Sequence, residues 1–599
     1  MIYHCEDHTC NYWDEGEKLP ERCPQCGRKL LRANEADMTG DDWTALGNTL
    51  WDAEASDKKR MVDCFRKAAY LGSAWGVCNL GICMEQGNGV EADPVQAFWL
   101  YQQAVEMGSL NAVCCLGVCY EYGIGTAPDA KHAAELYCKA AEYGSPRGQM
   151  LLAHAFHDGI GVEADAAEAV HWVRAAAYQR YGEGMYWLGV CYEYGDGVEQ
   201  NWEHAVHWFR EAAESGVSAA MTDLGWCYEK GCGVEQSWEQ AFSWYRRGAE
   251  CGNLQSMHNL GYCYEKGYGV EQSWEQAFSW YRRGAECGNP VSMSNLGLCY
   301  KRGYGVEQNW QEAIKWYERG AQCGNLQSMN NLAYCYEYGE GVEQNEERAL
   351  YWYRRGAEAG SDYCMYCLGW NYSNGEGVEQ NMTEAIRWYT AAAEGGNADA
   401  MHDLGWLYDH GEGVEQDMKK AICWYERAAE QNCPAAMNSL GECYAMGRGV
   451  PRDLETAMEW YRRAAELGEA MADYNMGWHL EQAGKLSEAY AHYRKAADGN
   501  DDSAWWALGR FYENGVVVAQ DGKEARRCYE TGEKLGSVKC KMRLARCKLL
   551  GIGGRRAKKA GLDLCRQALE LAKESSEKED YGYEAEMNLL RRTIAENES

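Results

Sequence analysis

A turn of sequence Gly-x-Gly-Val returns every 36 residues along most of this 599-residue chain. The second glycine of the turn stands at Gly89, Gly161, Gly197, Gly233, Gly269, Gly305, Gly341, Gly377, Gly413 and Gly449, and Gly125 takes the same place before Thr126. Residues 233–253 and 269–289 are identical. A fixed period of this length indicates one supersecondary unit copied many times, each copy burying its apolar face on the next. The chain is therefore expected to fold as a solenoid.

One unit can be read between residues 219 and 252. Met221, Leu224 and Tyr228 recur at helical spacing, so they predict the core face of a first helix. The glycines at 231 and 233 stop that helix, because glycine readily takes the positive φ of a helix end. Ser237, with Gln240 three residues later, has the spacing of a capping box and predicts where the second helix begins.

The leucine of the first helix recurs with the same step from Leu80 to Leu440, and Leu46, Met476, Leu508 and Leu544 extend the series with two shorter steps of 34 and 32, which gives about fifteen units. The motifs Leu-Gly-x-x-Tyr, Gly-x-Gly-Val and Ala-x-x-Trp-Tyr-x-x-Ala-Ala-Glu-x-Gly closely resemble the Sel1-like repeat, a tetratricopeptide-type unit. The resemblance covers roughly residues 40–575 and implies an all-α, right-handed superhelical solenoid, with residues 576–599 as a C-terminal helical cap. Members of that family mostly serve as adaptors and scaffolds, often in bacteria.

The first 32 residues differ from the repeats and predict a small zinc ribbon. Cys23-Pro-Gln-Cys26-Gly has the spacing of a metal knuckle, and Cys5 with Cys10, or with His8 in place of Cys10, supplies the other half. The segment resembles a rubredoxin-like ribbon, although the usual first Cys-x-x-Cys-Gly is broken. Structural zinc is the expected cofactor, since so short a segment cannot build a core of its own.

Composition limits the partners and the compartment. A formal charge of −32 repels phosphate backbones, so it argues against nucleic acid and favours basic protein partners. The N-terminus has no apolar signal segment and no stretch is long enough to span a bilayer. We therefore expect a cytoplasmic protein without a membrane partner.

Most of the 29 cysteines belong to the repeats. Those that precede the repeat tyrosine are Cys119, Cys191, Cys227, Cys263, Cys299 and Cys335. Equivalent positions on packed helices are roughly 8–10 Å apart, too far for a disulfide. They are expected to be reduced and mostly buried, as are the Trp-Tyr pairs of the second helices (for example 244/245), which we interpret as inter-repeat core.

Two charge features stand out from the repeat. Glu199, Glu235, Glu271, Glu307, Glu343, Glu379 and Glu415 share one loop position and predict an acidic row. Residues 539–559 carry nine basic side chains and no acid, which could dock an anionic partner or the protein's own acidic surface. We find no catalytic constellation, and the paired histidines 154/157 and 204/207 lack a third ligand, so the chain is not expected to be an enzyme or to take a small-molecule substrate.

The predicted function is that of a protein-binding scaffold. The position after Leu-Gly carries Trp226, Tyr262, Leu298, Tyr334, Trp370 and Trp406 in successive units. Together with Thr222, Glu229 and Lys230 it forms a face away from the core, which the resemblance places in the concave groove. Large exposed aromatic side chains usually mark contacts, and the alternative is that these rings pack between first helices. Two further functions remain open: a nucleic-acid-associated factor using the ribbon and residues 539–559, and a redox protein with iron in the ribbon.

Overall fold

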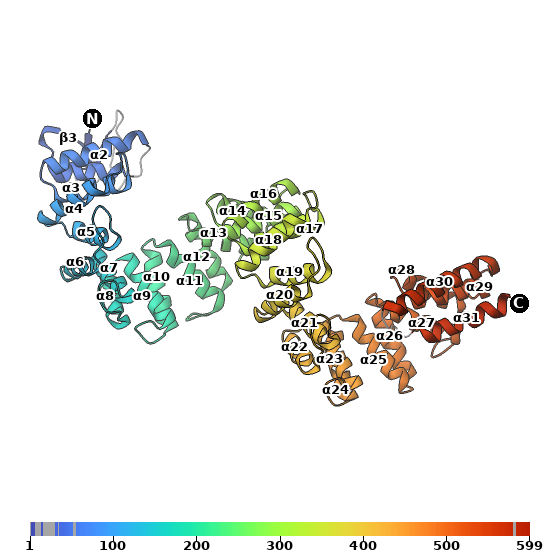
Figure 1. The fold of residues 1–599 in the computed structure, drawn as a ribbon. Coiled ribbons are helices and arrows are strands. Elements are labelled where there is room, and N and C mark those ends of the chain that lie inside the picture. The colour runs from blue at the N-terminus through green and yellow to red at the C-terminus, as the bar shows by residue number, and fades with distance from the viewer. Residues whose placement is uncertain are drawn as a thin grey trace. The chain divides into compact units, whose positions relative to one another are not determined.

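The computed structural model describes residues 2–5, 13–15, 30–33, 35–51, 55–578 and 583–598. The chain divides into two compact units, residues 1–309 and 310–599 (Figure 1). Within the described residues, α1 to α30 follow one another as fifteen helix pairs, so the predicted repeat number is confirmed. The right hand of the superhelix stays a prediction.

The first unit begins with a short 3-10 helix, Glu35–Asp37. Its α-helices are α1 Gly40–Thr49, α2 Ala55–Tyr70, α3 Ala74–Gln86, α4 Pro94–Glu106, α5 Leu110–Tyr122, α6 Ala130–Glu142, α7 Pro146–Asp158, α8 Ala166–Tyr178, α9 Gly182–Tyr194, α10 Trp202–Glu214, α11 Ser218–Lys230, α12 Trp238–Glu250, α13 Leu254–Lys266, α14 Trp274–Glu286 and α15 Pro290–Arg302.

The second unit continues the same alternation of helices. Its helices are α16 Trp310–Gln322, α17 Leu326–Tyr338, α18 Glu346–Glu358, α19 Asp362–Asn374, α20 Met382–Glu394, α21 Ala398–His410, α22 Met418–Glu430, α23 Pro434–Met446, α24 Leu454–Glu466, α25 Ala470–Gln482, α26 Leu486–Asp498, α27 Asp502–Asn514, α28 Gly522–Lys534, α29 Val538–Leu550, α30 Lys558–Lys578 and α31 Glu584–Glu598.

A three-stranded antiparallel sheet precedes the helices. Its strands are β1 Ile2–Cys5, β2 Trp13–Glu15 and β3 Leu30–Ala33, in the order β2-β1-β3, with Ile2 opposite both Glu15 and Ala33. The predicted ligands Cys10, Cys23 and Cys26, and the alternative His8, lie outside the described residues, and only the backbone of Cys5 is described. Zinc therefore stays a prediction for this segment.

Most repeats are closed by a tyrosine of the second helix, and Phe65 and Phe209 take its place in two others. The ring of Tyr245 lies on Gly225, where a Cβ atom would stand 2.6 Å from the ring carbon Cε1. Its hydroxyl donates to Glu229 of the same repeat at 2.8 Å. The same bond joins Tyr101 to Glu85, Tyr137 to Glu121, Tyr281 to Glu265, Tyr353 to Glu337, Tyr493 to Glu481 and Tyr529 to Glu513. The glycine after the repeat leucine is thus required for close packing, and the buried hydroxyl is satisfied.

The Gly-x-Gly-Val turn joins one repeat to the one before it. Gly231 ends α11 with φ 74°, and Gly233 follows with φ 69°. A side chain at Gly233 would collide with the backbone carbonyl of Trp202, the first residue of the preceding second helix. The hydroxyl of Ser237 then accepts the backbone N–H of Gln240 at 3.3 Å and donates to Glu239. The predicted helix start is confirmed, but the return bond of a capping box does not form, because the backbone N–H of Ser237 donates to the carbonyl of Tyr228 at 2.9 Å.

The tyrosine and the tryptophan of each Trp-Tyr pair have separate roles. Tyr245 contacts Gly225 and Glu229 of its own first helix, and it also lies in one buried cluster with Met257 and Leu260 of the next repeat, so the prediction of inter-repeat core is confirmed for it. Trp280 packs against the same cluster, which contains Tyr245 of the preceding repeat, as predicted. Arginine side chains of the second helices lie over these tryptophans. The Arg247 guanidinium, for example, is 4.3 Å from the centre of the Trp244 ring.

The repeat cysteines are free thiols in the described part of the chain, and most of them are buried. Burial raises the pKa of Cys227, Cys263 and Cys299 to about 12, which keeps these thiols protonated. Four cysteines depart from the prediction because they follow second helices or face outward, and these are Cys251, Cys287, Cys323 and Cys423.

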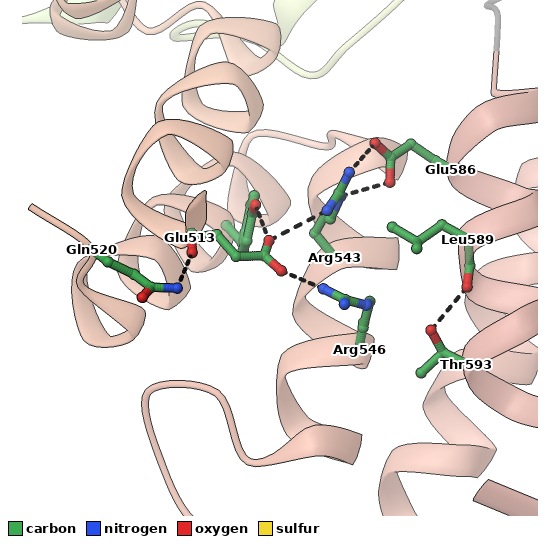
Figure 2. A network of polar contacts seen from close by, with 8 residues as sticks. Glu513, Gln520, Arg543, Arg546, Glu586, Leu589 and Thr593 are labelled. Carbon is green, nitrogen blue, oxygen red and sulfur yellow. Dashed lines mark hydrogen bonds and ion pairs between the residues drawn. The ribbon is translucent and has the colours of Figure 1, made fainter. Parts of the chain in front are cut away.

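The C-terminal end is held by buried charge. Arg543 of α29 bonds Glu586 of α31 at 2.6 Å and Glu513 of α27 at 3.3 Å, and Arg546 also contacts Glu513 (Figure 2). Lys539 lies 5.3 Å from the Trp506 ring. Part of the basic stretch 539–559 is therefore bound to the protein's own acids, which is one of the outcomes that its composition left open.

Candidate functional site

The predicted aromatic row lies at the surface of the first helices. Trp226 and Tyr262 are each 37% exposed, Trp370 is 46% exposed and Trp406 is 39% exposed, whereas Tyr334 is half-buried. Met221 and Leu224, on the predicted core face, are almost fully buried. The structure therefore brings these rings to an accessible face, and their binding role stays a prediction.

Two residues assigned to that face by helical spacing lie elsewhere. Thr222 is buried and its hydroxyl is 2.6 Å from that of Ser256 on the neighbouring first helix. The Glu229 side chain is only 17% exposed, because it accepts the Tyr245 hydroxyl. Helical spacing gave the correct side of the first helix for Thr222 and Glu229. Neighbouring helices, however, cover both side chains.

At the turns between repeats, the aromatic row of the first helices lies close to further aromatic side chains. Trp238, at the start of α12, stacks on Tyr268 of the next turn with ring centroids 4.2 Å apart, and Tyr262 lies 5.9 Å from the same tyrosine. Lys230 forms an ion pair with Glu229 at 2.8 Å beside them. We call these five residues, Glu229, Lys230, Trp238, Tyr262 and Tyr268, the stacked site. Sequence reasoning missed it, although the paired Trp and Tyr at fixed repeat positions were a usable signal.

Three repeats later, the same position is an open cavity of about 480 Å³. Glu337, Tyr338, Glu346, Trp370 and Glu376 line it, and we call this set the acidic cavity. Leu350 forms part of its apolar wall. Burial raises the pKa of Glu337, and the charge of Glu376 adds to that effect, against the hydrogen bond from Tyr353. The cavity contains the most exposed ring of the predicted row.

A second cavity of about 480 Å³ lies at the equivalent position in the first unit. Met150, Val170 and Val190 line it, with His157 at the rim. The His157 ring is 2.5 Å from Asp158 and 3.1 Å from Asp196, and the hydrogen bond to Asp158 raises its pKa. His157 is thus an exposed surface histidine, as expected, held in place by two carboxylates.

The acidic loop row is exposed at all seven positions from Glu199 to Glu415. Among the described residues, no group of three or more His, Cys, Asp and Glu side chains is arranged to hold a metal ion. The described helices include none with the length and apolar character needed to cross a bilayer. The accessible chemistry of this surface is therefore aromatic contact and negative charge.

Comparison with known proteins gives one family. The family model of the Sel1 repeat matches residues 76–109, 112–145, 146–181, 182–217, 218–253, 254–289, 290–325, 326–361, 362–397, 398–433, 434–469, 470–501 and 504–537. No curated protein sequence matches the chain.

The chain is also similar to several solved structures. The chain is 32% identical to c5321, a protective antigen present in uropathogenic Escherichia coli strains displaying an SLR fold, over 75% of this chain and 97% of that one, with a TM-score of 0.53. It is 26% identical to a Sel1 repeat protein from Oxalobacter formigenes, over 51% and 89% of the two chains, with a TM-score of 0.42. An immunity protein of Pseudomonas aeruginosa, Pa5087, is 20% identical over 36% and 81%, with a TM-score of 0.27.

Proposed function

Since this chain belongs to the Sel1 repeat family, whose members generally act as protein-interaction scaffolds, we propose that it binds a segment of a partner protein along the aromatic row of its first helices. The observation that carries the proposal is the exposure of Trp226, Tyr262, Trp370 and Trp406 at one repeat position. These rings lie beside the core rather than in it, so packing alone does not require their size. Tryptophan and tyrosine dominate binding hot spots because they offer large, rigid contact surfaces.

Charge supports a partner that is basic. The net charge of −32 and the exposed glutamates of the loop row would attract a cationic segment and speed its association. The nucleic-acid alternative loses support, because Arg543 and Arg546 are engaged with Glu513 and Glu586. Family membership also favours a role without catalysis.

The test is affinity capture with the full chain as bait, followed by measurement of binding to the captured partner. Trp370→Ala should weaken binding by about 2 kcal/mol, roughly 30-fold, with little loss of stability. Tyr351→Ala is the matched control, because Tyr351 is 50% exposed on the second helix α18, outside the row. Equal binding by wild type, Trp226→Ala, Tyr262→Ala and Trp370→Ala would show that the row is not the binding surface. Capture of nucleic acid instead would support the alternative function.

A further inference from the structure

The acidic cavity and the stacked site occupy the same position of the repeat, yet three of their five side chains differ in charge. Relative to the stacked site, Trp238 becomes Glu346, Tyr268 becomes Glu376, and Lys230 becomes Tyr338. The glutamate that accepts the repeat tyrosine is kept, as Glu229 and Glu337. Two carboxylates have thus replaced the aromatic stack, and a tyrosine has replaced the lysine that balanced the kept glutamate.

The charge of the two sites follows from those substitutions. In the stacked site the Glu229 carboxylate is balanced by Lys230, so the formal charge is zero. In the acidic cavity Glu337, Glu346 and Glu376 are all acids and Tyr338 brings no positive charge, so the formal charge is −3. The next repeat after the stacked site, with Lys266 on Glu265 at 2.8 Å, keeps the balance. Lysine or arginine occupies this position in three consecutive repeats, as Lys230, Lys266 and Arg302, and Tyr338 ends that run.

The three carboxylates line one open cavity, and the backbone next to Glu376 lies beside Glu346. A Cβ atom on Gly377, the neighbour of Glu376, would stand 3.4 Å from the Glu346 carboxylate oxygen. Burial disfavours the ionisation of Glu337, and the charge of Glu376 adds a smaller effect in the same direction. Within the described part of the chain, neither Glu346 nor Glu376 forms a side-chain hydrogen bond or ion pair. Like charges held together without a cation destabilise one another, and an incoming cation relieves that repulsion.

Besides the carboxylates, the cavity offers a cation the aromatic surfaces of Trp370 and Tyr338. Their rings are 46% and 61% exposed, and both line the cavity. A guanidinium group stacks on aromatic faces and bonds carboxylates with a planar fork of N–H groups, whereas an ammonium group acts as a point charge. A cavity of about 480 Å³ has room for a whole side chain with its apolar stem against Leu350.

We propose that the acidic cavity receives an arginine side chain from a basic segment of the partner protein. The inference rests on the proposed function, because it names the chemistry that one repeat of the binding surface selects. The carboxylates of Glu346 and Glu376 accept the guanidinium N–H groups, and the Trp370 ring packs on its face. The stacked site, three repeats earlier, offers the partner only aromatic surface at the same position.

A labelled peptide provides the test. The probe is a fluorescein-labelled peptide of four Gly-Ser-Arg repeats, and its counterpart carries citrulline, the neutral isostere, in place of arginine. Fluorescence anisotropy with the full chain at physiological salt should give about tenfold tighter binding for the arginine peptide. Equal affinity for both peptides overturns the proposal.

Two double variants separate the cavity from the general negative field. Glu346→Gln with Glu376→Gln should weaken arginine-peptide binding about tenfold, whereas Glu343→Gln with Glu379→Gln, which removes the same charge from the exposed loop row, should change it less than about twofold. Equal losses in both doubles overturn the proposal in favour of diffuse attraction. Glu346→Trp with Glu376→Tyr rebuilds the stacked pair, so it should abolish arginine selectivity while the melting temperature stays level or rises.

The outcome is distinguishable from that of the proposed function. In one outcome, the double variant Glu346→Gln with Glu376→Gln leaves arginine-peptide binding unchanged while Trp226→Ala or Tyr262→Ala still weakens binding of the natural partner. In that case the scaffold role stands and this inference fails. If none of the row variants releases the partner, the proposed function fails, whatever the peptide does.

Discussion

The stacked site and the acidic cavity share a backbone and differ in what they show to a partner. Both are built where the start of a second helix meets the turn of the next repeat, and both keep the buried tyrosine that donates to a glutamate, Tyr245 in one and Tyr353 in the other. In the stacked site the Trp238 and Tyr268 rings pack against each other. In the acidic cavity Glu346 and Glu376 carry the same charge, so they cannot form a favourable contact of this kind. The comparison teaches that the residues that hold the repeat together are different from those proposed to contact a partner.

The largest effect should come from the residues that the two sites share. Tyr245→Ala and Tyr353→Ala each remove a buried ring, so each should cost about 3–5 kcal/mol in its own repeat. Native-state hydrogen exchange of α11–α12 and of α17–α18 measures this locally, which suits a chain whose repeats contact mainly their neighbours. Tyr245→Phe and Tyr353→Phe serve as controls that keep the ring. A repeat that tolerates the alanine would show that its two helices are held together by other contacts.

A smaller effect is expected when one site is converted into the other. Trp238→Glu, Tyr268→Glu and Lys230→Tyr together place the acidic set in the stacked site. Loss of the stacked rings should cost about 0.5–1.5 kcal/mol, and isothermal titration should show one additional binding site for the arginine peptide. The single variant Lys230→Tyr controls for charge loss alone. If the triple variant gains no site, the five named side chains are insufficient to define one.

The smallest effect concerns acidity, and only the acidic cavity should show it. The pKa of Glu337 is raised in the folded protein, so its ionisation costs stability: this group stabilises the fold at low pH, and that contribution is lost as the pH rises through its folded pKa. Arginine binding is favoured by the ionised form, which adds a third negative charge to the cavity. Affinity for the arginine peptide should therefore fall a few-fold as the pH drops through the range just above the ordinary value of about 4.3.

The groups that face Glu337 set the control for that measurement. Tyr353 donates to it, and Tyr338, Glu346 and Glu376 line the same cavity. Glu337→Gln still accepts the Tyr353 hydroxyl but cannot titrate, so it should flatten the pH dependence of peptide binding above the ordinary glutamate pKa, as read by anisotropy. An unchanged pH profile in this variant would assign the titration to another carboxylate.

Much of the local structure could be predicted from the residues. The 36-residue step located the helix pairs, the turn at Gly231 and Gly233, and the buried Met221 and Leu224. Helical spacing failed for Thr222 and Glu229, because it gives a direction around one helix and takes no account of what lies opposite. It also did not show that Tyr245 contacts its own first helix as well as the next one, since a ring on a second helix can reach both.

The sequence by itself determined the repeat, its two helices and the residues that vary within it, because hydrophobic period, glycine and caps act over a few residues of chain. The tertiary structure alone decided that Glu346 and Glu376, thirty positions apart in different repeats, would share one cavity with Trp370. Their meeting depends on how a second helix packs against the next repeat. Packing of side chains between helices, rather than any local pattern, sets that geometry.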